Sequence, residues 1–347
     1  MKLLVTGGAG FIGSNFVRYV LSLGAGHSVV NYDKLTYAGN LENLESVADH
    51  PNYQFIKGDI CDAAAATEAM SGCDAVVHFA AESHVDRSIY EPAPVIQTNV
   101  TGTFLLLEAA RERKIQKFVQ VSTDEVYGDI PVSAWADESY PLQPNSPYSA
   151  SKASADMLVR SFVRTYGFPA VITRSSNNYG PYQFPEKFLP LIIGNALEDK
   201  PLPMYGDGIQ ERDWLHAEDN CRAIFAVLLS GRPGDVYNIG TGKTQRNIEM
   251  ARTVLRILDK PESLISYVKD RPGHDRRYAL NCSKLNKELG WEPSISLEDG
   301  LAKTVDWYCQ NADWMRSVRD GNYMTYYERY YVNRDSALES IARSSGG

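Results

Sequence analysis

Hydrophobic and polar residues in the first half of the chain form two kinds of segment. Apolar residues three and four positions apart predict helices at Phe11–Leu23, Val95–Arg111 and Tyr148–Tyr166. Short apolar runs fit buried strands, and these are Leu3–Thr6, Ser28–Tyr32, Tyr53–Lys57, Ala75–Phe79, Lys117–Ser122 and Ala170–Thr173. Strands that alternate with helices in this way indicate an α/β fold whose parallel sheet is covered by helices on both faces.

The second half follows a different pattern. Beyond Ser175 the chain mixes long loops with short helices, and it is interrupted by Pro181, Pro185, Pro190, Pro201 and Pro203. We therefore expect a smaller, mixed α/β domain that binds the substrate. We assign residues 1–175 to the first domain, with 212–240 and about 292–316 returning to it, and residues 176–211, 241–291 and 317–347 to the second.

Composition excludes several classes of protein. The chain has 347 residues, 44% of them hydrophobic, and a formal net charge of −8, which argues against binding to nucleic acid or to anionic membranes. Its five cysteines form no CxxC pair and its six histidines form no cluster, so we expect reduced thiols and no metal site. We recognise no signal peptide, and no apolar run reaches the roughly 20 residues of a membrane helix. We therefore expect a cytoplasmic protein.

A glycine-rich turn, Gly7–Gly13, joins the first predicted strand to the first predicted helix. Glycine here permits a tight turn, brings backbone N–H groups close to a pyrophosphate, and lets helix and strand pack closely. Asp33 ends the second strand, where a carboxylate accepts hydrogen bonds from the adenosine ribose of NAD and disfavours NADP. This order of elements predicts a Rossmann-type, doubly wound sheet that binds NAD. Asp59 and Ile60 fit either the edge of the adenine or a simple loop cap.

Tyr148 and Lys152 lie four residues apart at the start of a predicted helix, and so on one helical face. A lysine ammonium near a tyrosine hydroxyl stabilises the phenolate and lowers the pKa of the tyrosine, which can then act as a general base on an alcohol. Such a pair alone is most simply a surface feature. Downstream of an NAD-binding turn it favours alcohol oxidation with hydride transfer.

Three polar residues, Thr123, Asp124 and Glu125, follow the fifth predicted strand, whose carboxyl end faces the ligand crevice of a parallel sheet. We expect the threonine hydroxyl to contact substrate. Two neighbouring carboxyl groups can be driven to different pKa values and so provide one acid and one base. Simple oxidation needs neither group, whereas the loss of water needs both. The alternative is that Asp124 caps the following turn and Glu125 is solvated.

With these motifs, the sequence resembles the extended short-chain dehydrogenase/reductase family and, more narrowly, the dTDP-glucose 4,6-dehydratases. The resemblance runs from Met1 to about Asn333. The segments that carry it are Gly7–Gly13, Tyr32–Asn40, His78–Ser88, Thr98–Val100, Thr123–Glu125, Tyr148–Lys152, Asn177–Pro181 and Asp270–Asp275. The glycine turn and the Tyr–Lys motif mark only the wider family. The segments Tyr32–Asn40 and Thr123–Glu125 are narrower, since related epimerases usually carry small residues in place of the two acids.

The resemblance implies a lyase reaction on a dehydrogenase fold. Tyr148, helped by Lys152 and Thr123, takes the proton from the 4-hydroxyl of glucose while hydride passes from C4 to NAD. Glu125 removes the C5 proton, Asp124 protonates the departing 6-hydroxyl, and the hydride returns to C6. The product is a 4-keto-6-deoxy sugar nucleotide, and NAD ends as it began and stays bound.

The resemblance also implies two sets of binding residues. The expected cofactor-binding residues are Gly7, Gly10, Phe11, Ile12, Gly13, Asp33, Lys34, Leu35, Thr36, Gly39, Asp59, Ile60, Ala80, Ala81, Ser83, Thr98, Tyr148, Lys152 and Asn178. The expected substrate-binding residues are Ser83, Thr123, Asn177, Glu186, Lys187, Pro203, Tyr205, Arg212, Asn247, Arg271, His274 and Tyr278. Among these, the two arginines suit a diphosphate, because a guanidinium can donate two hydrogen bonds at once.

Family members are typically homodimers joined through the helices that begin near Val95 and Tyr148, and we expect the same here. Several alternatives remain open at this stage. A nucleotide-sugar 4-epimerase would leave both acids without a role, and a decarboxylase would need a cation for a sugar carboxylate. The same dehydratase could act on UDP- or CDP-glucose. A catalytically inactive NAD-binding scaffold would be expected to lack part of the motifs, and all of them are present.

Overall fold

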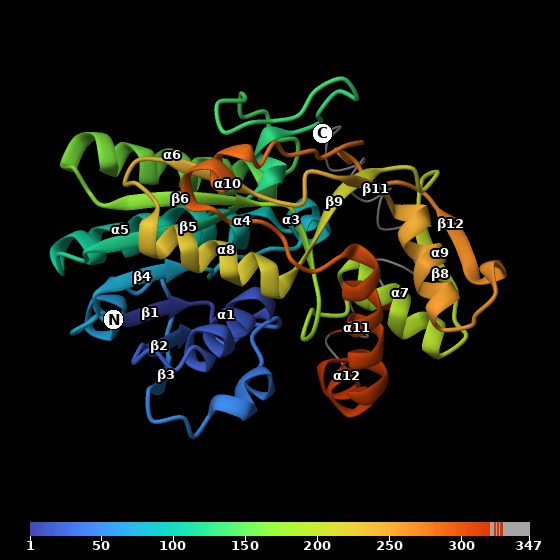
Figure 1. Ribbon diagram of the computed structural model, residues 1–347, viewed down its shortest axis with the longest axis horizontal. Coiled ribbons are helices and arrows are strands. Elements are labelled where there is room, and N and C mark those ends of the chain that lie inside the picture. Colours follow the sequence, from blue (N-terminus) through green and yellow to red (C-terminus); the bar gives the residue numbers. More distant parts are fainter. Residues whose placement is uncertain (320–322, 324, 326, 329–347) are drawn as a thin grey trace.

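The computed structural model describes residues 1–319 together with 323, 325, 327 and 328, and it contains a larger and a smaller unit (Figure 1). The larger unit is built on a seven-stranded sheet in the order β3-β2-β1-β4-β5-β6-β10. Every neighbouring pair in this sheet is parallel. Its strands are β1 (Lys2–Thr6), β2 (Ser28–Asp33), β3 (Tyr53–Lys57), β4 (Ala75–His78), β5 (Lys117–Thr123), β6 (Ala170–Ser175) and β10 (Val236–Ile239). The predicted α/β class and the six predicted strands are confirmed.

Alternation along the strands explains why both faces of this sheet are covered. In β1, Leu3 and Val5 pack into one apolar cluster, and Leu4 between them packs into another. The first cluster lies under α1 (Phe11–Ser22) and α8 (Ala217–Ser230). The second lies under α2 (Ala63–Ala69), α5 (Thr103–Glu112) and α6 (Pro147–Tyr166). Because the strand order reverses between β1 and β4, a ligand crevice is expected at the carboxyl ends of these two strands.

The helix predicted over Val95–Arg111 is not one regular helix. It begins as α4 (Pro92–Ile96), widens into a π-type turn over Gln97–Gly102, and continues as α5. Inside the wide turn, the amide of Asn99 both accepts from the backbone N–H of Glu82 and donates to its carbonyl, at 2.9 Å each. A side chain that bonds to a distant backbone is a tertiary feature, so helical periodicity alone did not predict the irregularity.

The smaller unit contains a three-stranded sheet of β7 (Asn177–Tyr179), β9 (Glu211–His216) and β11 (Thr244–Arg246). A second pair is formed by β8 (Leu202–Tyr205) and β12 (Ile265–Val268). Its apolar cluster is shared by α7 (Phe188–Leu197), α9 (Asn247–Ile257), α11 (Leu297–Gln310) and α12 (Ala312–Val318). The remaining short elements are η1 (Leu41–Val47), α3 (Val85–Tyr90), η3 (Asp124–Tyr127), η4 (Glu262–Leu264) and α10 (Ser283–Leu289).

Two segments pack against a different unit from the one that the expected domain boundaries assign to them. Leu301, Val305 and Tyr308 of α11 pack into the cluster of the smaller unit, although 292–316 was expected to return to the larger one. Conversely, α10 contacts β10 and α8, and Leu285 packs into a cluster of the larger unit. Helical periodicity identifies the apolar face of a helix but not the element that buries it, which accounts for both differences. Residues beyond 328 lie outside the described part of the chain.

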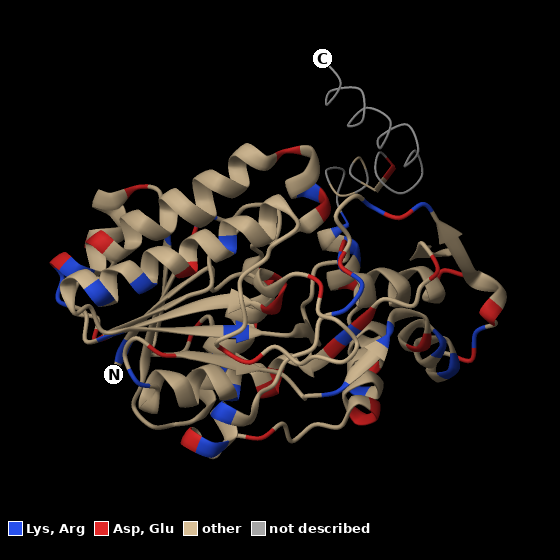
Figure 2. Cartoon of the chain, turned by 90° about the horizontal axis from the view of Figure 1, so that it is seen from above, with Lys and Arg blue, Asp and Glu red and all other residues tan. Residues whose placement is uncertain are grey.

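Acidic and basic residues are both scattered over the ribbon, and neither kind is confined to one part of the described chain (Figure 2). No helix among the described residues is long and apolar enough to cross a membrane. Within that same part of the chain, His, Cys, Asp and Glu form no group of three that could hold a metal ion.

Candidate active site

A first cavity opens at the carboxyl ends of β1, β2, β4 and β5 and is floored by the glycine turn. Gly7 has a φ of +70°, and a Cβ there would lie 2.6 Å from the amide nitrogen of Ala80. A Cβ at Gly13 would lie 2.2 Å from the carbonyl oxygen of Gly7. The turn as it stands therefore has no room for a Cβ at either position. It leaves the first N–H groups of α1 beside the cavity, in an arrangement that suits a pyrophosphate.

Asp33 ends β2 at the edge of this cavity. Its carboxylate accepts from the backbone N–H groups of Ala9 at 2.9 Å and Leu35 at 2.8 Å, so it shapes the turn as well as facing the cavity. Burial raises the pKa of Asp33, and these two hydrogen bonds oppose the rise. Each carboxylate oxygen keeps further acceptor capacity for a ribose hydroxyl.

Eighteen of the nineteen residues expected to bind the cofactor line the first cavity, and Leu35 is the exception because its side chain packs against the core of the larger unit. Lys34, which follows Asp33 in the chain, forms an ion pair with Asp59 at 2.7 Å. Asp59 also accepts from the backbone N–H of Cys61 at 2.9 Å, so its loop-capping role coexists with its place at the cavity.

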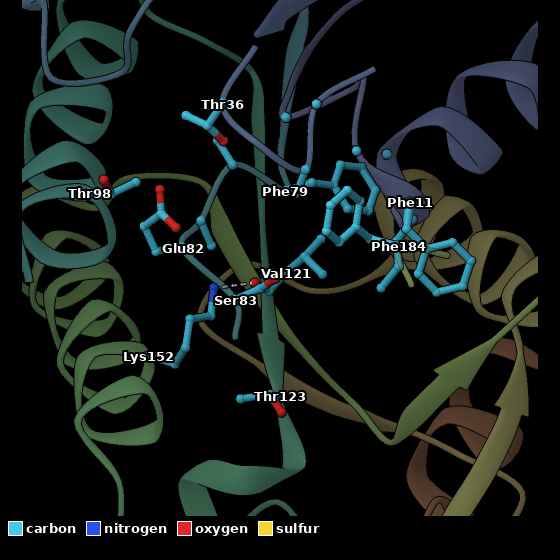
Figure 3. A pocket seen from close by; sticks show the side chains of 18 of the residues that line it. Phe11, Thr36, Phe79, Glu82, Ser83, Thr98, Val121, Thr123, Lys152 and Phe184 are labelled. Atoms are coloured by element: carbon cyan, nitrogen blue, oxygen red, sulfur yellow. Dashed lines mark hydrogen bonds between the residues drawn. The ribbon is translucent and has the colours of Figure 1, made fainter. Parts of the chain in front are cut away.

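Unpartnered polar atoms also line the cavity. The hydroxyls of Ser122 and Ser176 and the side-chain oxygens of Asn177 and Asn178 are buried and have no hydrogen-bond partner among the described residues. Buried polar atoms are normally paired, so these atoms indicate a polar ligand. Figure 3 shows Phe11, Phe79 and Phe184 on the side of the cavity that lies across from Thr98 and Lys152. A ligand with polar and aromatic parts, as NAD is, fits this combination of glycine turn, acid and unpaired oxygens.

Tyr148 and Lys152 lie on the first turns of α6, whose start is fixed by a capping box between Ser146 and Ser149. Lys152 is 4% exposed, and its ammonium donates to the carbonyl of Val121 in β5 at 2.8 Å (Figure 3). Burial lowers the pKa of Lys152 to about 8. Both side chains line the first cavity, where the sheet end and the helix start meet.

The expected lowering of the Tyr148 pKa by Lys152 is wrong for the protein alone. Burial, followed by the negative charges of Glu125 and Asp124, raises the pKa of Tyr148 above its usual value. A hydrogen bond with Thr123 opposes the rise. The sequence indicated a cation beside the phenol but not the two carboxyl groups that face it.

The two carboxyl groups follow β5 at the start of η3. Thr123, and not Asp124, caps this turn, since its hydroxyl accepts from the backbone N–H of Glu125 at 3.3 Å. Asp124 is 3% exposed, and one of its oxygens has no hydrogen-bond partner in the described part of the chain. Burial and then the charge of Glu125 raise the pKa of Asp124 well above its usual range.

Glu125 has different surroundings from its neighbour. Burial raises its pKa as well, but the positive charges of Arg271, Lys187 and Arg212 oppose the rise. Because only Arg212 among these cations also lowers the pKa of Asp124, the surroundings favour a proton on Asp124 over one on Glu125. The two acids can therefore serve as a general acid and a general base at one place.

A second cavity adjoins the first, and Glu125, Asn177, Glu186 and Lys187 line both. The other expected substrate residues that line it are Pro203, Tyr205, Arg212, Asn247, Arg271 and His274. Ser83 and Thr123 line the first cavity. Tyr278 lines neither cavity, but the guanidinium of Arg212 lies 4.1 Å from the centre of its ring. All five residues expected to be catalytic line the first cavity, and Glu125, which lines both, brings them next to the second.

The second cavity is rich in buried charged side chains that contact one another. Asp86 accepts from Arg271 at 2.7 Å and from the hydroxyl of Tyr205 at 2.8 Å. The Nε of Arg271 is buried and has no hydrogen-bond partner among the described residues, so it remains available to a ligand. Arg212 contacts a ring nitrogen of His274 at 3.1 Å. These arginines are held in place before an anion arrives.

Comparison with known proteins identifies the family. The chain matches the family described as GDP-mannose 4,6 dehydratase over residues 4–304. It is 51% identical to the dTDP-glucose 4,6-dehydratase of Shigella flexneri, with 96% of this chain and 100% of the relative covered. This chain belongs to the dTDP-glucose 4,6-dehydratase family.

Solved structures from this family have the same fold. The crystal structure of the dTDP-glucose 4,6-dehydratase from Streptomyces venezuelae, with NAD and a second ligand bound, gives a TM-score of 0.90 at 49% identity and covers 92% of this chain and 100% of its own. The family member from Bacillus anthracis, in complex with NAD, gives a TM-score of 0.87 at 48% identity and covers 92% of this chain and 99% of its own.

Several residues of the site had no role assigned from the sequence. Asp86 holds Arg271 and Tyr205, and Arg87 pairs with Glu186 at 2.9 Å. Both lie in the His78–Ser88 segment that carries the family resemblance, but nothing local shows that an acid there faces an arginine 185 residues away. Others become visible only through the fold, and these are Ser122, Ser176, Gln183, Phe184 and Trp214.

Proposed function

We propose that this chain converts dTDP-glucose to dTDP-4-keto-6-deoxyglucose and water, as an NAD-dependent lyase that retains its cofactor. One observation carries the proposal. Asp124 lines the first cavity and Glu125 lines both cavities, beside Tyr148 and Lys152, and the surroundings of the two acids favour different protonation states. An enzyme that only oxidises an alcohol has no use for this second acid–base pair.

The first cavity is the proposed NAD site. When bound, NAD⁺ accepts a hydride from the sugar, returns it later, and brings a positively charged ring. The turn Gly7–Gly13 receives the pyrophosphate, Asp33 the adenosine ribose, and the oxygens of Ser176 and Asn178 take polar groups further along the cleft.

Oxidation begins when Tyr148 takes the proton of the 4-hydroxyl, with the Thr123 hydroxyl beside it. Tyr148 can take this proton only as the phenolate, and the surrounding carboxyls, when they are ionised, oppose formation of the phenolate because they raise the pKa of Tyr148. A proton on Asp124 removes one of the two charges. The same proton that Asp124 needs as an acid therefore also helps Tyr148 to act as a base.

Elimination uses the two acids in opposite senses. Glu125, which faces Arg271, Lys187 and Arg212, is the proposed base for the C5 proton. Asp124 holds its proton because it is buried next to another carboxylate, and it is the proposed donor to the departing 6-hydroxyl. A 4-keto group makes the C5 proton acidic only after oxidation, so elimination must follow oxidation.

The second cavity is the proposed site of the nucleotide diphosphate. Arg212 and Arg271 are oriented by neighbouring acceptors and suit the diphosphate. Pro203, Tyr205 and Asn247 lie along the same cavity and are the proposed contacts of the nucleoside. A 4-epimerase or a decarboxylase on this fold would leave the acid–base pair of η3 unused.

The chain is also proposed to form a homodimer through α5 and α6. Ile96 and Phe104 on the α4–α5 segment and Met157 on α6 are large apolar side chains that remain exposed in the single chain. Burying them against a second copy would remove apolar surface from water. Sedimentation of the protein and of a Phe104→Glu variant tests this. A dimer that the variant weakens supports the interface, and a monomeric native protein would refute it.

The experiment that tests the function follows the sugar nucleotide by mass spectrometry after purified protein is mixed with dTDP-glucose without added NAD. Loss of one water without net NADH is the expected result. An unchanged mass with dTDP-glucose, and with added NAD, would contradict the proposal. Parallel reactions with UDP- and CDP-glucose decide the base, and an NMR search for the 4-epimer decides between dehydratase and epimerase.

A further inference from the structure

Arg174 of β6 is a buried arginine behind the catalytic centre that lines neither cavity. Its Nε donates to the carboxylate of Asp156 at 2.9 Å, and its Nη1 donates to the hydroxyl of Tyr127 at 2.9 Å. Asp156 and Tyr127 are both 0% exposed. The three side chains form one dry, charged group in the interior of the larger unit.

The two partners of Arg174 belong to the two catalytic elements. Asp156 lies on α6, four residues beyond Lys152 and eight beyond Tyr148, so the three side chains share one helical face. Tyr127 is the last residue of η3, the turn that begins with Asp124 and Glu125. A single guanidinium therefore bonds both to the helix that carries the oxidation residues and to the turn that carries the elimination residues.

This arrangement extends into the sheet. The hydroxyl of Tyr127 donates to the side-chain oxygen of Asn238 in β10 at 2.8 Å, and the amide of Asn238 donates to the carbonyl of Ala136 at 3.0 Å. The turn η3 is thus anchored to an edge strand as well as to β6. Because guanidinium and carboxylate hydrogen bonds are directional, movement of α6 relative to η3 would break one of them.

The charges of the group also reach the catalytic lysine. The carboxylate of Asp156 raises the pKa of Lys152, against the lowering caused by burial. Arg174 donates to one oxygen of Asp156, and the other oxygen has no hydrogen-bond partner among the described residues. A well-packed apolar pair commonly stabilises a core as well as a buried ion pair does, so stability alone does not account for these residues.

We propose that Arg174, together with Asp156 and Tyr127, is a positioning residue that holds Tyr148 and Lys152 in register with Asp124 and Glu125. Oxidation and elimination then act on one sugar pose, without the substrate having to shift between the two steps. The inference rests on the proposed dehydratase function. It concerns the geometry between two catalytic elements and assigns Arg174 no contact with substrate or cofactor.

The test compares Tyr127→Phe and Arg174→Lys with a matched control, Arg222→Lys. Arg222 also pairs with a buried aspartate, Asp219 in α8, but lies outside the catalytic elements. Each variant is isolated with its bound NAD and given dTDP-glucose. The measurements are the melting temperature, kcat, KM, and the fraction of enzyme that holds NADH during turnover.

Misplacement of about 1 Å can cost a catalytic step up to about 100-fold, so we expect kcat to fall about 10- to 100-fold in Arg174→Lys and several-fold in Tyr127→Phe. KM and NAD content should stay near the native values. Bound NADH should build up during turnover in both variants, because oxidation continues while the η3 acids are displaced. The Arg222→Lys control should change the melting temperature at most.

Some results would overturn the proposal. If Tyr127→Phe and Arg174→Lys melt earlier but keep native kcat and native levels of bound NADH, the group is only structural. Should Arg174→Lys fail to fold, Tyr127→Phe decides alone, because it keeps the ion pair. The native protein in the same assay reports separately on the dehydratase function, and if it releases no water from the sugar, both proposals fail.

Discussion

The two cavities of this protein differ in the kinds of group that line them. The floor of the first is backbone and glycine, and its polar wall contains serine and asparagine oxygens that lack partners among the described residues. The second is lined by charged side chains that are already paired, since Asp86 pairs with Arg271, and Glu186 pairs with Arg87 outside the lining. One cavity thus matches a ligand by the shape of its backbone, and the other by charges fixed in advance.

This difference suits the proposed roles of the two ligands. A cofactor that stays bound is held by many short-range contacts with a rigid glycine turn. Those contacts depend on the shape of this turn. A substrate that must enter and leave meets arginines whose orientation is set before it arrives, which reduces the entropy lost on binding. Variants in the two cavities should therefore separate NAD retention from the binding of sugar nucleotide, and variants at their junction should affect neither.

The largest effect is expected at the junction. In Tyr148→Phe the general base is lost, and such groups contribute roughly 10²- to 10⁴-fold to rate. We expect kcat to fall by that factor while NAD content and substrate KM stay within about twofold. Tyr166→Phe, at the exposed end of the same helix, is the matched control and should retain activity. Native turnover by Tyr148→Phe would remove Tyr148 from the mechanism.

In the second cavity, Arg271→Gln removes a charged donor and leaves Asp86 buried without its cation. Hydrogen bonds to charged groups contribute about 1.5–3 kcal/mol, so KM for dTDP-glucose should rise about 10- to 150-fold. NAD content should not change. Arg276→Gln is the matched control, because Arg276 lies on the same loop as Arg271. Its side chain forms an exposed ion pair with Asp207. If the two variants have equal KM values, Arg271 does not bind the diphosphate.

In the first cavity, Gly13→Ala would place a Cβ 2.2 Å from the carbonyl oxygen of Gly7. Overpacking of this kind typically costs about 1–3 kcal/mol, and the purified variant should contain less NAD than the native protein. Gly10→Ala places its Cβ 3.3 Å from the same oxygen and should lose less. KM for the sugar nucleotide, measured with saturating NAD, should stay near native in both. Full NAD retention by Gly13→Ala would contradict the rigid-turn account.

The last expected effect concerns the pH dependence of stability and not activity, and it arises behind the first cavity. His78 is 1% exposed and lies between the hydroxyls of Thr6 and Thr103, at 2.7 and 3.1 Å. Burial, then the charge of Lys152, lowers the pKa of His78 to about 3. Its pKa in the unfolded chain is about 6.5, so folding favours the neutral ring. The associated stability is complete above that pH and is lost as pH falls toward 3.

The measurement for His78 is the free energy of unfolding between pH 7 and pH 4. The native protein should lose up to about 1.4 kcal/mol per pH unit relative to His78→Asn, because only the native protein must take up this proton on unfolding. Other titrating groups are common to both proteins and cancel in the difference. A difference that stays constant with pH would show that His78 is not held neutral.

The same contrast explains how much the sequence could predict. The glycine turn, Asp33 and the Tyr148–Lys152 pair are local patterns with a fixed place in a strand–helix alternation, and they were found in the cavity where they were expected. Six of the seven strands of the large sheet follow from apolar runs. The residues of the second cavity were expected only from the family resemblance, because no local pattern marks them. They come together only when β8, β9 and the segment around Arg271 fold over α3.

What could not be predicted depends on long-range partners. The pKa of Tyr148 rises because Glu125 and Asp124 face it, and the pairing of Asp86 with Arg271 spans 185 positions. The π-type turn before α5 depends on the bonds of Asn99 to Glu82. Likewise, the unit against which α10 and α11 pack depends on which apolar surface the other elements leave exposed.

The most direct test of the whole account uses dTDP-glucose that carries deuterium at C4, mixed with the native protein without added NAD. We expect a product that has lost one water and carries the deuterium at C6. In the proposed mechanism, one site removes the hydride, holds it and returns it to the same sugar. Deuterium that is lost to solvent, or that remains at C4 of an unchanged or epimerised sugar, would contradict the account.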